Sequence, residues 1–338
     1  MGGRRYVIRK IMQALATLVF ILLFNFFLFR IMPSDPVKLL TKGKGVQLTQ
    51  GAQEQLIIDL GLDKPVLPIS LRPLALHADN QLFQYVGDTL TGDFGPSLLF
   101  QGRSVVDVFL TALWPTLLLV GGATILMTII GLYLGIRGGW SRGSRLDTGS
   151  MGFSLLFYSM PDFWLAMMLL VLFSTYLGWF PSGGYSTPNA DLSGLAHIVD
   201  VMNHLFLPIV TLTVGYLGEY YLIMRSSLLD VLGEEYITTV RAKGIREDSV
   251  LWGHAVRNAL LPTISQIALG FGFILGGAIT VELVFSYPGL GLLTIQALDS
   301  QDFRLLQGLF LFASVAVLLS NLAADLLYSW FDPRVKEA

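Results

Sequence analysis

The sequence contains no cysteine among its 338 residues. A chain without thiols cannot form a disulfide framework, a thiolate nucleophile or a cysteine-ligated metal site. Any binding or catalytic chemistry must therefore come from other side chains.

Charged residues are also scarce, since 14% of the residues are Asp, Glu, Lys or Arg while 53% are hydrophobic. The mean hydropathy is +0.63. In soluble domains about a quarter of the residues are charged, so this composition indicates a polytopic membrane protein. Its net charge of -2 identifies no partner, because in such a protein the position of each Lys and Arg relative to the apolar runs matters more.

The motifs of several enzyme classes are missing. The sequence has no G-x-x-x-x-G-K-[ST] phosphate loop, so we expect no ATP hydrolysis by this chain. It has no H-E-x-x-H, and Gly152-Phe153-Ser154 lacks the closing glycine of a nucleophile elbow. The four histidines do not fall at metal-ligand spacing within one helix: His77, His197, His204 and His254. We expect a non-catalytic chain without a metal or cofactor of its own.

Six apolar runs are near or above the roughly 20 residues that cross a bilayer. The first follows a basic start, exceeds a signal-peptide core and lacks a cleavage site, so it is interpreted as a retained helix. The predicted fold is all-α with six transmembrane helices, at about residues 11–32, 109–136, 151–178, 205–224, 263–284 and 305–327.

Between the first two runs lies a polar region, for which short helices are predicted at Gln50 to Leu60 and Gln81 to Leu90. Gly92-Asp93-Phe94-Gly95 predicts a turn. The expected domains are residues 1–32 with the first helix, 33–107 as a small extracytoplasmic subdomain, and 108–338 as a five-helix core.

The basic residues predict the orientation of the chain. Four Lys or Arg precede the first span, three lie in the 137–150 loop, five in residues 225–262 and two in the C-terminal tail. The 179–204 loop has none and the 285–304 loop has one, Arg304. Because cytoplasmic loops are enriched in positive charge, both termini are predicted to be cytoplasmic.

Four ionisable residues fall within or beside the predicted spans: Asp162, Glu219, Glu282 and Asp325. Ionisable groups in a bilayer usually face the protein interior or lie near an end, and each is a functional candidate. Glu219 is the deepest, while the other three lie near span ends, where a structural role is the alternative. Pro161 should kink its helix, and glycines such as Gly122, Gly131 and Gly135 fit close helix packing.

The stretch from Met224 to Pro262 is the one long charged segment between apolar runs, with five basic and five acidic residues. Its apolar residues recur at helical spacing on either side of Gly244. This pattern predicts two short amphipathic helices joined at a glycine, which together form a docking surface.

The same stretch carries specific motifs, as does the chain that follows it. They are Arg225-Ser226-Ser227-Leu228-Leu229, Arg241-Ala242-Lys243-Gly244, His254 to Pro262, Val281-Glu282, Phe285 to Gly291, Asp325 to Tyr328 and Asp332-Pro333-Arg334. With these residues the sequence resembles the inner-membrane permease subunits of binding-protein-dependent ABC importers, in the dipeptide, oligopeptide and nickel branch. Thr238-Thr239-Val240 stands where the general family motif has Glu-Ala-Ala, and the late proline, Pro262, is typical of the peptide branch.

The resemblance implies a type I ABC importer fold in a bacterial or archaeal inner membrane. It implies a second homologous permease subunit, an extracytoplasmic binding protein, and two ATPase subunits or domains that hold ATP and Mg; no nucleic acid is expected. The first helix of the charged segment would be the coupling helix that sits on an ATPase subunit, with apolar Tyr236, Ile237 and Val240 as an anchor within a charged rim. The residues expected to couple to the ATPase are Glu234, Glu235, Tyr236, Val240, Arg241, Ala242, Lys243 and Gly244. The candidates for pathway or gating are Glu219, Glu282, Pro288 and Gly289.

Peptides are the substrates that the resemblance favours, with nickel or another small solute as the alternative. Two other classes stay open. A polytopic membrane enzyme would use Asp162, Glu219 and His204, although no nucleophile or metal pattern supports it. An ion-coupled secondary transporter would have no use for an ATPase-docking segment.

Overall fold

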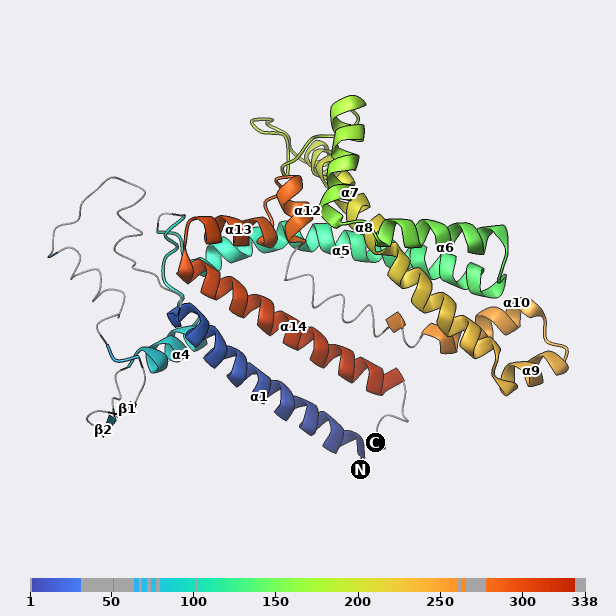
Figure 1. Cartoon of the computed structure of the whole chain (residues 1–338), viewed down its shortest axis with the longest axis horizontal. Coiled ribbons are helices and arrows are strands. Elements are labelled where there is room, and N and C mark those ends of the chain that lie inside the picture. Colours follow the sequence, from blue (N-terminus) through green and yellow to red (C-terminus); the bar gives the residue numbers. More distant parts are fainter. Residues whose placement is uncertain are drawn as a thin grey trace. The chain divides into compact units, whose positions relative to one another are not determined.

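The computed structural model describes residues 2–31, 51, 64–66, 69–71, 74–76, 80–100, 102–260, 263–264 and 278–331. These residues are mostly helical (Figure 1). The predicted all-α class is confirmed, with one addition in the described part: strands β1 (Ile69–Leu71) and β2 (Leu74–Leu76) form an antiparallel pair. The expected helix from Gln50 to Leu60 lies almost wholly outside the described residues.

The chain divides into two compact units. Unit 1 comprises Met1–Ala14, Thr111–Leu293 and Val315–Ala338, and unit 2 comprises Leu15–Leu110 and Thr294–Ser314. The long helices are α1 (Gly2–Ile31), α5 (Val105–Trp140), α8 (Leu195–Leu232) and α14 (Phe303–Phe331).

Each of these four helices contains a stretch long and apolar enough to cross a membrane: Tyr6–Phe29, Val105–Trp140, Leu195–Leu232 and Phe303–Ala323. They correspond to the predicted first, second, fourth and sixth spans. Most of the predicted fifth span, residues 263–284, lies outside the described residues. The count of six spans therefore stays a prediction.

The predicted third span is not one kinked helix. It is divided into α6 (Arg145–Tyr158) and α7 (Asp162–Leu169), and α7 continues into a π-helical turn, η1 (Leu170–Tyr176). The two parts are bent by 103° at the break. Pro161 lies in this break and cannot donate a backbone hydrogen bond, and the bend is much larger than the kink that the sequence predicts.

Unit 2 is held together by a buried amide and a buried carboxylate. Asn25 on α1 donates to the hydroxyl of Tyr85 on α4 (Gln81–Thr91; 3.1 Å) and to the carbonyl of Gln307 on α14 (3.0 Å). Asp302, which precedes α14, accepts hydrogen bonds from the Ser97 hydroxyl (2.6 Å) and the Leu98 amide (2.7 Å). These bonds fasten α4 and the loop that follows it to α1 and α14.

Local sequence explains the bounds of α4. The Asn80 side chain accepts a hydrogen bond from the Phe83 amide (2.9 Å) and caps the N-terminus. Gly92 ends the helix in the left-handed conformation, with φ of 76°. The predicted helix over residues 81–90 and the turn after it are confirmed.

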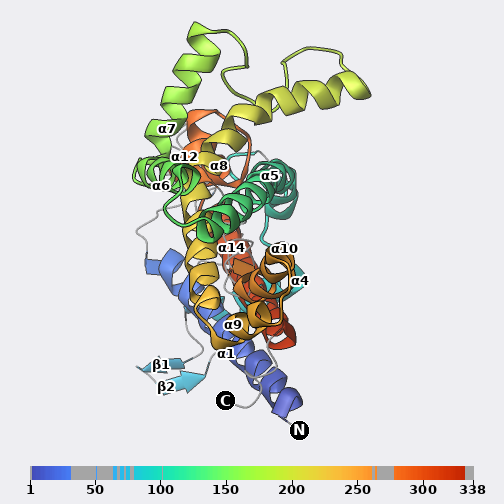
Figure 2. The ribbon, with the colours of Figure 1, turned by 90° about the vertical axis from the view of Figure 1, so that its right-hand side faces the viewer.

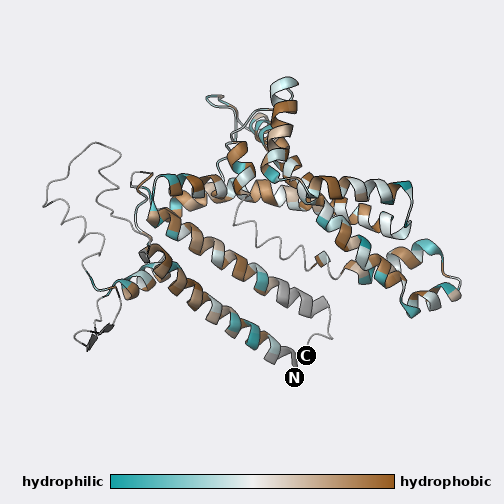
Figure 3. Cartoon of the chain, in the orientation of Figure 1, coloured by the Kyte–Doolittle hydropathy of each residue, from teal (hydrophilic) through white to brown (hydrophobic). Residues whose placement is uncertain are grey.

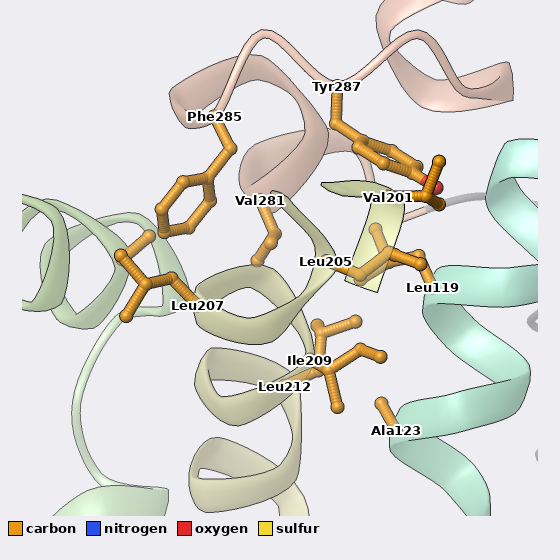
Figure 4. Packing of buried hydrophobic residues seen from close by; sticks show 11 residues of the cluster. Leu119, Ala123, Val201, Leu205, Leu207, Ile209, Leu212, Val281, Phe285 and Tyr287 are labelled. Carbon is orange, nitrogen blue, oxygen red and sulfur yellow. The ribbon is translucent and has the colours of Figure 1, made fainter. Parts of the chain in front are cut away.

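In unit 1, the apolar core lies between α5, α7, α8 and α12 (Ile279–Val284), as Figure 4 shows. Leu119 and Ala123 of α5 face Leu205 and Ile209 of α8 in this cluster. The cluster is covered by Val281 of α12 and by Phe285 and Tyr287, which follow α12 in the chain. The turned view in Figure 2 shows α7 and α12 beside the middle of α8.

Close contact between α5 and α8 depends on glycine. An added Cβ at Gly135 would lie 2.7 Å from the Met224 Cβ and 2.9 Å from the Tyr221 carbonyl oxygen, and one at Gly131 would lie 2.5 Å from the Tyr220 Cβ. A Cβ at Gly122 would meet only the end of the Ile209 side chain on α8, which can move. The helices approach closely because Gly131 and Gly135 lack side chains.

Replacement of Gly135 by Val should destabilise unit 1 by about 1–3 kcal/mol, because the new side chain overlaps α8 backbone. The thermal unfolding midpoint of the detergent-purified chain measures the effect. Gly149→Val on α6 is the matched control, since nothing lies within 4 Å of a Cβ there. Equal midpoints for the two variants would show that the α5 and α8 contact tolerates a side chain.

Candidate functional site

The charged segment, residues 225–262, is largely described. It contains the last turns of α8, then α9 (Glu235–Ala242), α10 (Glu247–Ser249), the π-helical turn η2 (Val250–Ala255) and helical residues 256–260. Figures 1 and 2 show α9 at the end of α8 remote from α7. Figure 3 shows hydrophilic residues gathered at α9, α10 and the turn between them.

Gly244 makes the turn between the two helical parts, as predicted. Its φ is +73°, a conformation that side-chain-bearing residues rarely adopt. The Gly244 amide donates to the Arg241 carbonyl (2.9 Å), which closes the end of α9. Nothing lies within 4 Å of a Cβ at this position, so backbone conformation alone favours glycine here.

One side of α9 is buried in the chain itself. Ile237 has no exposed surface and lies in a cluster with Met224 and Leu228 of α8, Ile136 of α5 and Val250 of η2. Val240 lies partly buried against the same cluster. The expectation that Ile237 anchors a partner is therefore wrong, because its side chain holds α9 to α5 and α8.

The other side of α9 is exposed. Glu235, Thr238, Thr239 and Ala242 lie on it at helical spacing, and Lys243 and Gly244 follow it. Tyr236, at its edge, is 37% exposed and its hydroxyl accepts a hydrogen bond from the Asn258 amide (2.7 Å). We call Glu235, Thr238, Thr239 and Ala242 the outer face of α9.

Acidic residues begin α9. Glu234 takes the N-cap position without a side-chain capping bond, and Glu235 is in the first turn. Carboxylates there interact favourably with the partial positive charge of the helix N-terminus. Both are exposed, so the N-terminal end of α9 presents negative charge to solvent.

Arg241 is engaged within the chain. Its Nε and Nη2 atoms donate to Glu247 Oε1 and Oε2, both at 3.1 Å, and its guanidinium lies 5.6 Å from the centre of the Trp140 ring. The pair is partly exposed, with 43% of the Arg241 and 59% of the Glu247 side chain accessible. The pair joins α9 to α10 across the Gly244 turn. Arg241 therefore contributes to the conformation of the segment as well as to its charge.

A buried ion pair lies at the start of the charged segment, between Arg225 of α8 and Asp147 of α6. Arg225 Nε donates to Asp147 Oδ1 (2.6 Å) and Nη2 donates to Oδ2 (2.8 Å). The Tyr221 hydroxyl (2.7 Å) and the Gly143 amide (2.9 Å) also donate to this carboxylate. Sequence reasoning noted Arg225 but missed Asp147, since no local pattern links residues 78 positions apart.

Glu282 lies in a second buried cluster, at the start of α13 (Leu290–Asp299). Its Oε1 accepts from the Thr116 hydroxyl (2.8 Å) and its Oε2 from the Leu292 amide (3.0 Å). The Thr116 Oγ in turn accepts from the Leu290 amide (2.8 Å). A carboxylate at a helix N-terminus is favourable, so Glu282 fastens α12 to α5 and α13.

Gly289 and Pro288 form the turn inside this cluster. Gly289 is buried directly against the Glu282 carboxyl group and Thr116, where a Cβ would overlap both, whereas Pro288 is exposed. Burial raises the pKa of the neighbouring Tyr287 hydroxyl above its ordinary value. The protonated hydroxyl donates to the Pro115 carbonyl (3.1 Å).

The loop after η1 rests on the same turn. The Gly184 amide donates to the Phe285 carbonyl (2.9 Å), and the backbone of Gly183 lies against that carbonyl so closely that no side chain fits. The rings of Tyr185 and Tyr287 are 6.0 Å apart. The Gly183-Gly184-Tyr185 and Tyr287-Pro288-Gly289 loops are thus one assembly.

Glu219 lies apart from the Glu282 cluster. It is half-buried on α8, one turn after Tyr216, whose hydroxyl donates to Asp162 Oδ2 at the start of α7 (2.8 Å). Among the described residues, no three His, Asp or Glu side chains gather where they could hold a metal ion. The pathway candidates therefore occupy two places, one on α8 and one at the turn between α12 and α13.

Comparison with known proteins identifies the family of this chain. Residues 127–337 match the family of binding-protein-dependent transport system inner membrane components, and residues 4–117 match the N-terminal family of such membrane components. The chain belongs to this family of transport-system permeases, and it is a multi-pass inner-membrane protein.

Curated relatives match over nearly the whole chain. The oligopeptide transport system permease protein AppB of Bacillus subtilis is 33% identical over 331 residues, which cover 98% of this chain and 99% of the relative. The dipeptide transport system permease protein DppB of Escherichia coli is 33% identical over 349 residues, with 98% of each covered. A protein of Brucella suis named as a peptide permease is 35% identical over 332 residues, covering 98% and 99%.

Replacement of Glu282 by Ala should leave the Thr116 hydroxyl and the Leu292 amide without their acceptor in a buried site. We expect a loss of about 1–3 kcal/mol for each donor, visible as a lower unfolding midpoint of the purified chain. Glu282→Gln keeps one acceptor oxygen and should lose less. If Glu282→Gln kept full stability yet abolished uptake, Glu282 would instead act in the pathway.

Proposed function

We propose that this chain forms half of the translocation path of an ATP-driven importer of di- or oligopeptides. The names of the relatives, which describe peptide, dipeptide and oligopeptide permeases, support this substrate class. A second homologous permease subunit forms the other half of the path, and an extracytoplasmic binding protein delivers the solute. ATP and Mg bind to partner ATPase subunits, and this chain is a non-catalytic component.

The observation that carries the ATPase partnership is the division of α9 into two faces. Its inner face is attached to α5 and α8 through Ile237, so α9 has a fixed position at the end of the transmembrane core. Its outer face consists of Glu235, Thr238, Thr239 and Ala242 and is exposed. Small side chains let a partner groove approach the helix closely, and the charged residues at both ends give the contact its orientation.

In this proposal the charged segment and both termini are cytoplasmic, because positive charge is concentrated there. Closure of the ATPase subunits on nucleotide displaces α9 and shifts the helices between inward-open and outward-open states. The Gly183-Gly184-Tyr185 and Tyr287-Pro288-Gly289 assembly faces the opposite side of the membrane.

Competition for uptake tests the substrate class. Cells that depend on this importer should take up a labelled dipeptide, and an excess of unlabelled di- or oligopeptides should reduce the uptake while Ni²⁺ leaves it unchanged. Competition by Ni²⁺ alone would assign the chain to a metal importer. The same cells without the binding protein supply the background rate.

Co-purification tests the ATPase partnership. A tagged chain extracted from membranes that contain the whole importer should retain two ATPase subunits. Substitution of Thr238 and Thr239 by Trp on the outer face should remove them. A chain that binds no ATPase in either form would contradict the partnership.

Replacement of Gly244 by Val should uncouple transport. A residue other than glycine at φ of +73° costs about 1–2 kcal/mol, so the turn should relax and displace the end of α9. We expect normal amounts of the subunit in the membrane and reduced uptake per ATPase present. Gly253→Val is the control, because a Cβ there meets nothing within 4 Å and its φ is not positive. Wild-type uptake in Gly244→Val would contradict the proposed role of the turn.

Arg241→Glu should also reduce uptake, and a charge exchange distinguishes two reasons. If Arg241 acts through its pair with Glu247, the double variant Arg241→Glu, Glu247→Arg should recover most of the uptake. Exposed pairs contribute about 0.2–1 kcal/mol, so membrane levels should not change. Failure of the exchange with intact membrane levels would mean that Arg241 contacts the ATPase directly.

A further inference from the structure

The ion pair between Arg225 and Asp147 lies apart from the outer face of α9, yet it is next to the cluster that holds α9 in place. Arg225 directly follows Met224 and is one turn before Leu228, and both of these residues belong to the cluster that buries Ile237 of α9. The turn of α8 that carries Arg225 is therefore in direct contact with the cluster that holds α9.

The cluster beneath α9 contains residues of α5, α8, α9, η2 and the helix after η2, but none of α6. At this end of unit 1, α6 is connected to α8 through Asp147. The carboxylate is nearly buried, with 4% of the Asp147 and 16% of the Arg225 side chain accessible. The contact between them thus lies on a direct route from α9 to α6.

The geometry of the pair makes it stiff. Four donors converge on the Asp147 carboxylate: Arg225 Nε, Arg225 Nη2, the Tyr221 hydroxyl and the Gly143 amide. The two-pronged contact of a planar guanidinium fixes orientation as well as distance. Asp147 is itself fixed at the start of α6, because its amide donates to the capping Ser144 hydroxyl (3.2 Å).

Beyond the pair, α8 holds the bent helices at two more points. The backbone of Gly218 is so close to Ser154 of α6 that a Cβ would lie 2.8 Å from the Ser154 carbonyl oxygen. Past the break, Tyr216 bonds Asp162 at the start of α7. The bent helices α6 and α7 are thus attached along α8, and the attachment nearest α9 is ionic.

We propose that Arg225 and Asp147 are positioning residues for energy coupling, which make α6 and α7 move together with α9 and α8 when the ATPase subunits close. This rests on the proposed ATPase partnership. In this proposal the pair acts through α6 and α8 and not through contact with solute, nucleotide or partner. It determines how much of the displacement of α9 reaches the bent helices.

The test uses the complete importer in proteoliposomes, with both permease subunits, the ATPase subunits and the binding protein. The variant Asp147→Asn, Arg225→Gln removes both charges together, because a single substitution would leave one charge buried and unpaired. We expect assembly with the ATPase subunits to persist while the amount of solute transported per ATP hydrolysed falls about fivefold or more. Arg225→Lys keeps the charge without the two-pronged contact and should give an intermediate ratio.

The matched control removes one positive and one negative charge at exposed positions outside the charged segment. The double variant Arg145→Gln on α6 and Asp191→Asn in the loop before α8 changes two exposed residues, and it should keep the transport ratio within about twofold of wild type. It shows whether loss of charge alone changes coupling.

A distance measurement separates positioning from simple stabilisation. The chain lacks cysteine, so spin labels can be placed at Gly149→Cys on α6 and Ser226→Cys on α8, both exposed. In the otherwise wild-type chain the label separation should be the same without nucleotide and with ATP bound. In the Asp147→Asn, Arg225→Gln chain it should change with nucleotide, since α6 no longer follows α8.

The outcomes are distinct. If the wild-type chain does not associate with ATPase subunits, the proposed function fails. If it associates but the double variant has a wild-type transport ratio and an unchanged separation, the positioning role is wrong. Should the double variant not reach the membrane, Arg225→Lys decides, and a wild-type ratio there overturns the proposal.

Discussion

The close approach of α5 to α8 is the constraint on which the arrangement of unit 1 depends. Gly131 and Gly135 lie against Tyr220, Tyr221 and Met224, where side chains would overlap α8. In lipid no strong hydrophobic force draws helices together, so small residues that permit dense packing have a large effect. One turn further along, the same helix pair forms the cluster that receives Ile237, and so the position of α9 follows from how closely α5 and α8 lie.

This arrangement gives α9 two separate tasks. The inner face must be apolar to fill the cluster with Ile136, Met224 and Leu228, and the outer face must stay free. An eight-residue helix has marginal stability on its own, so the buried face and the Gly244 turn hold it in place. The ion pair between Arg241 and Glu247 keeps α10 against α9, although its exposure makes its contribution to stability small.

Much of this could be predicted from the sequence, where the signal is local. The Asn80 cap, the Gly92 turn and the left-handed Gly244 follow from residue type and neighbours. The sequence could not say which apolar residues of α9 face inward, because a surface for a partner and a surface for the chain's own core have the same pattern. It underestimated the break at Pro161, since proline removes one hydrogen bond but tertiary packing determines the 103° bend. The Asp147 to Arg225 pair joins distant residues and leaves no local pattern.

The two buried carboxylates explain why ionisable residues in a membrane protein need not line its pathway. Asp147 and Glu282 both accept several hydrogen bonds within the protein, and both hold the N-terminal turn of a helix, α6 and α13 respectively. A buried carboxylate with its lone pairs satisfied by fixed donors orients the groups around it and has little capacity left for a passing solute. Glu219 has a different setting, half-buried on α8 beside Tyr216 and away from any helix N-terminus. Its part in the pathway stays a prediction from the sequence.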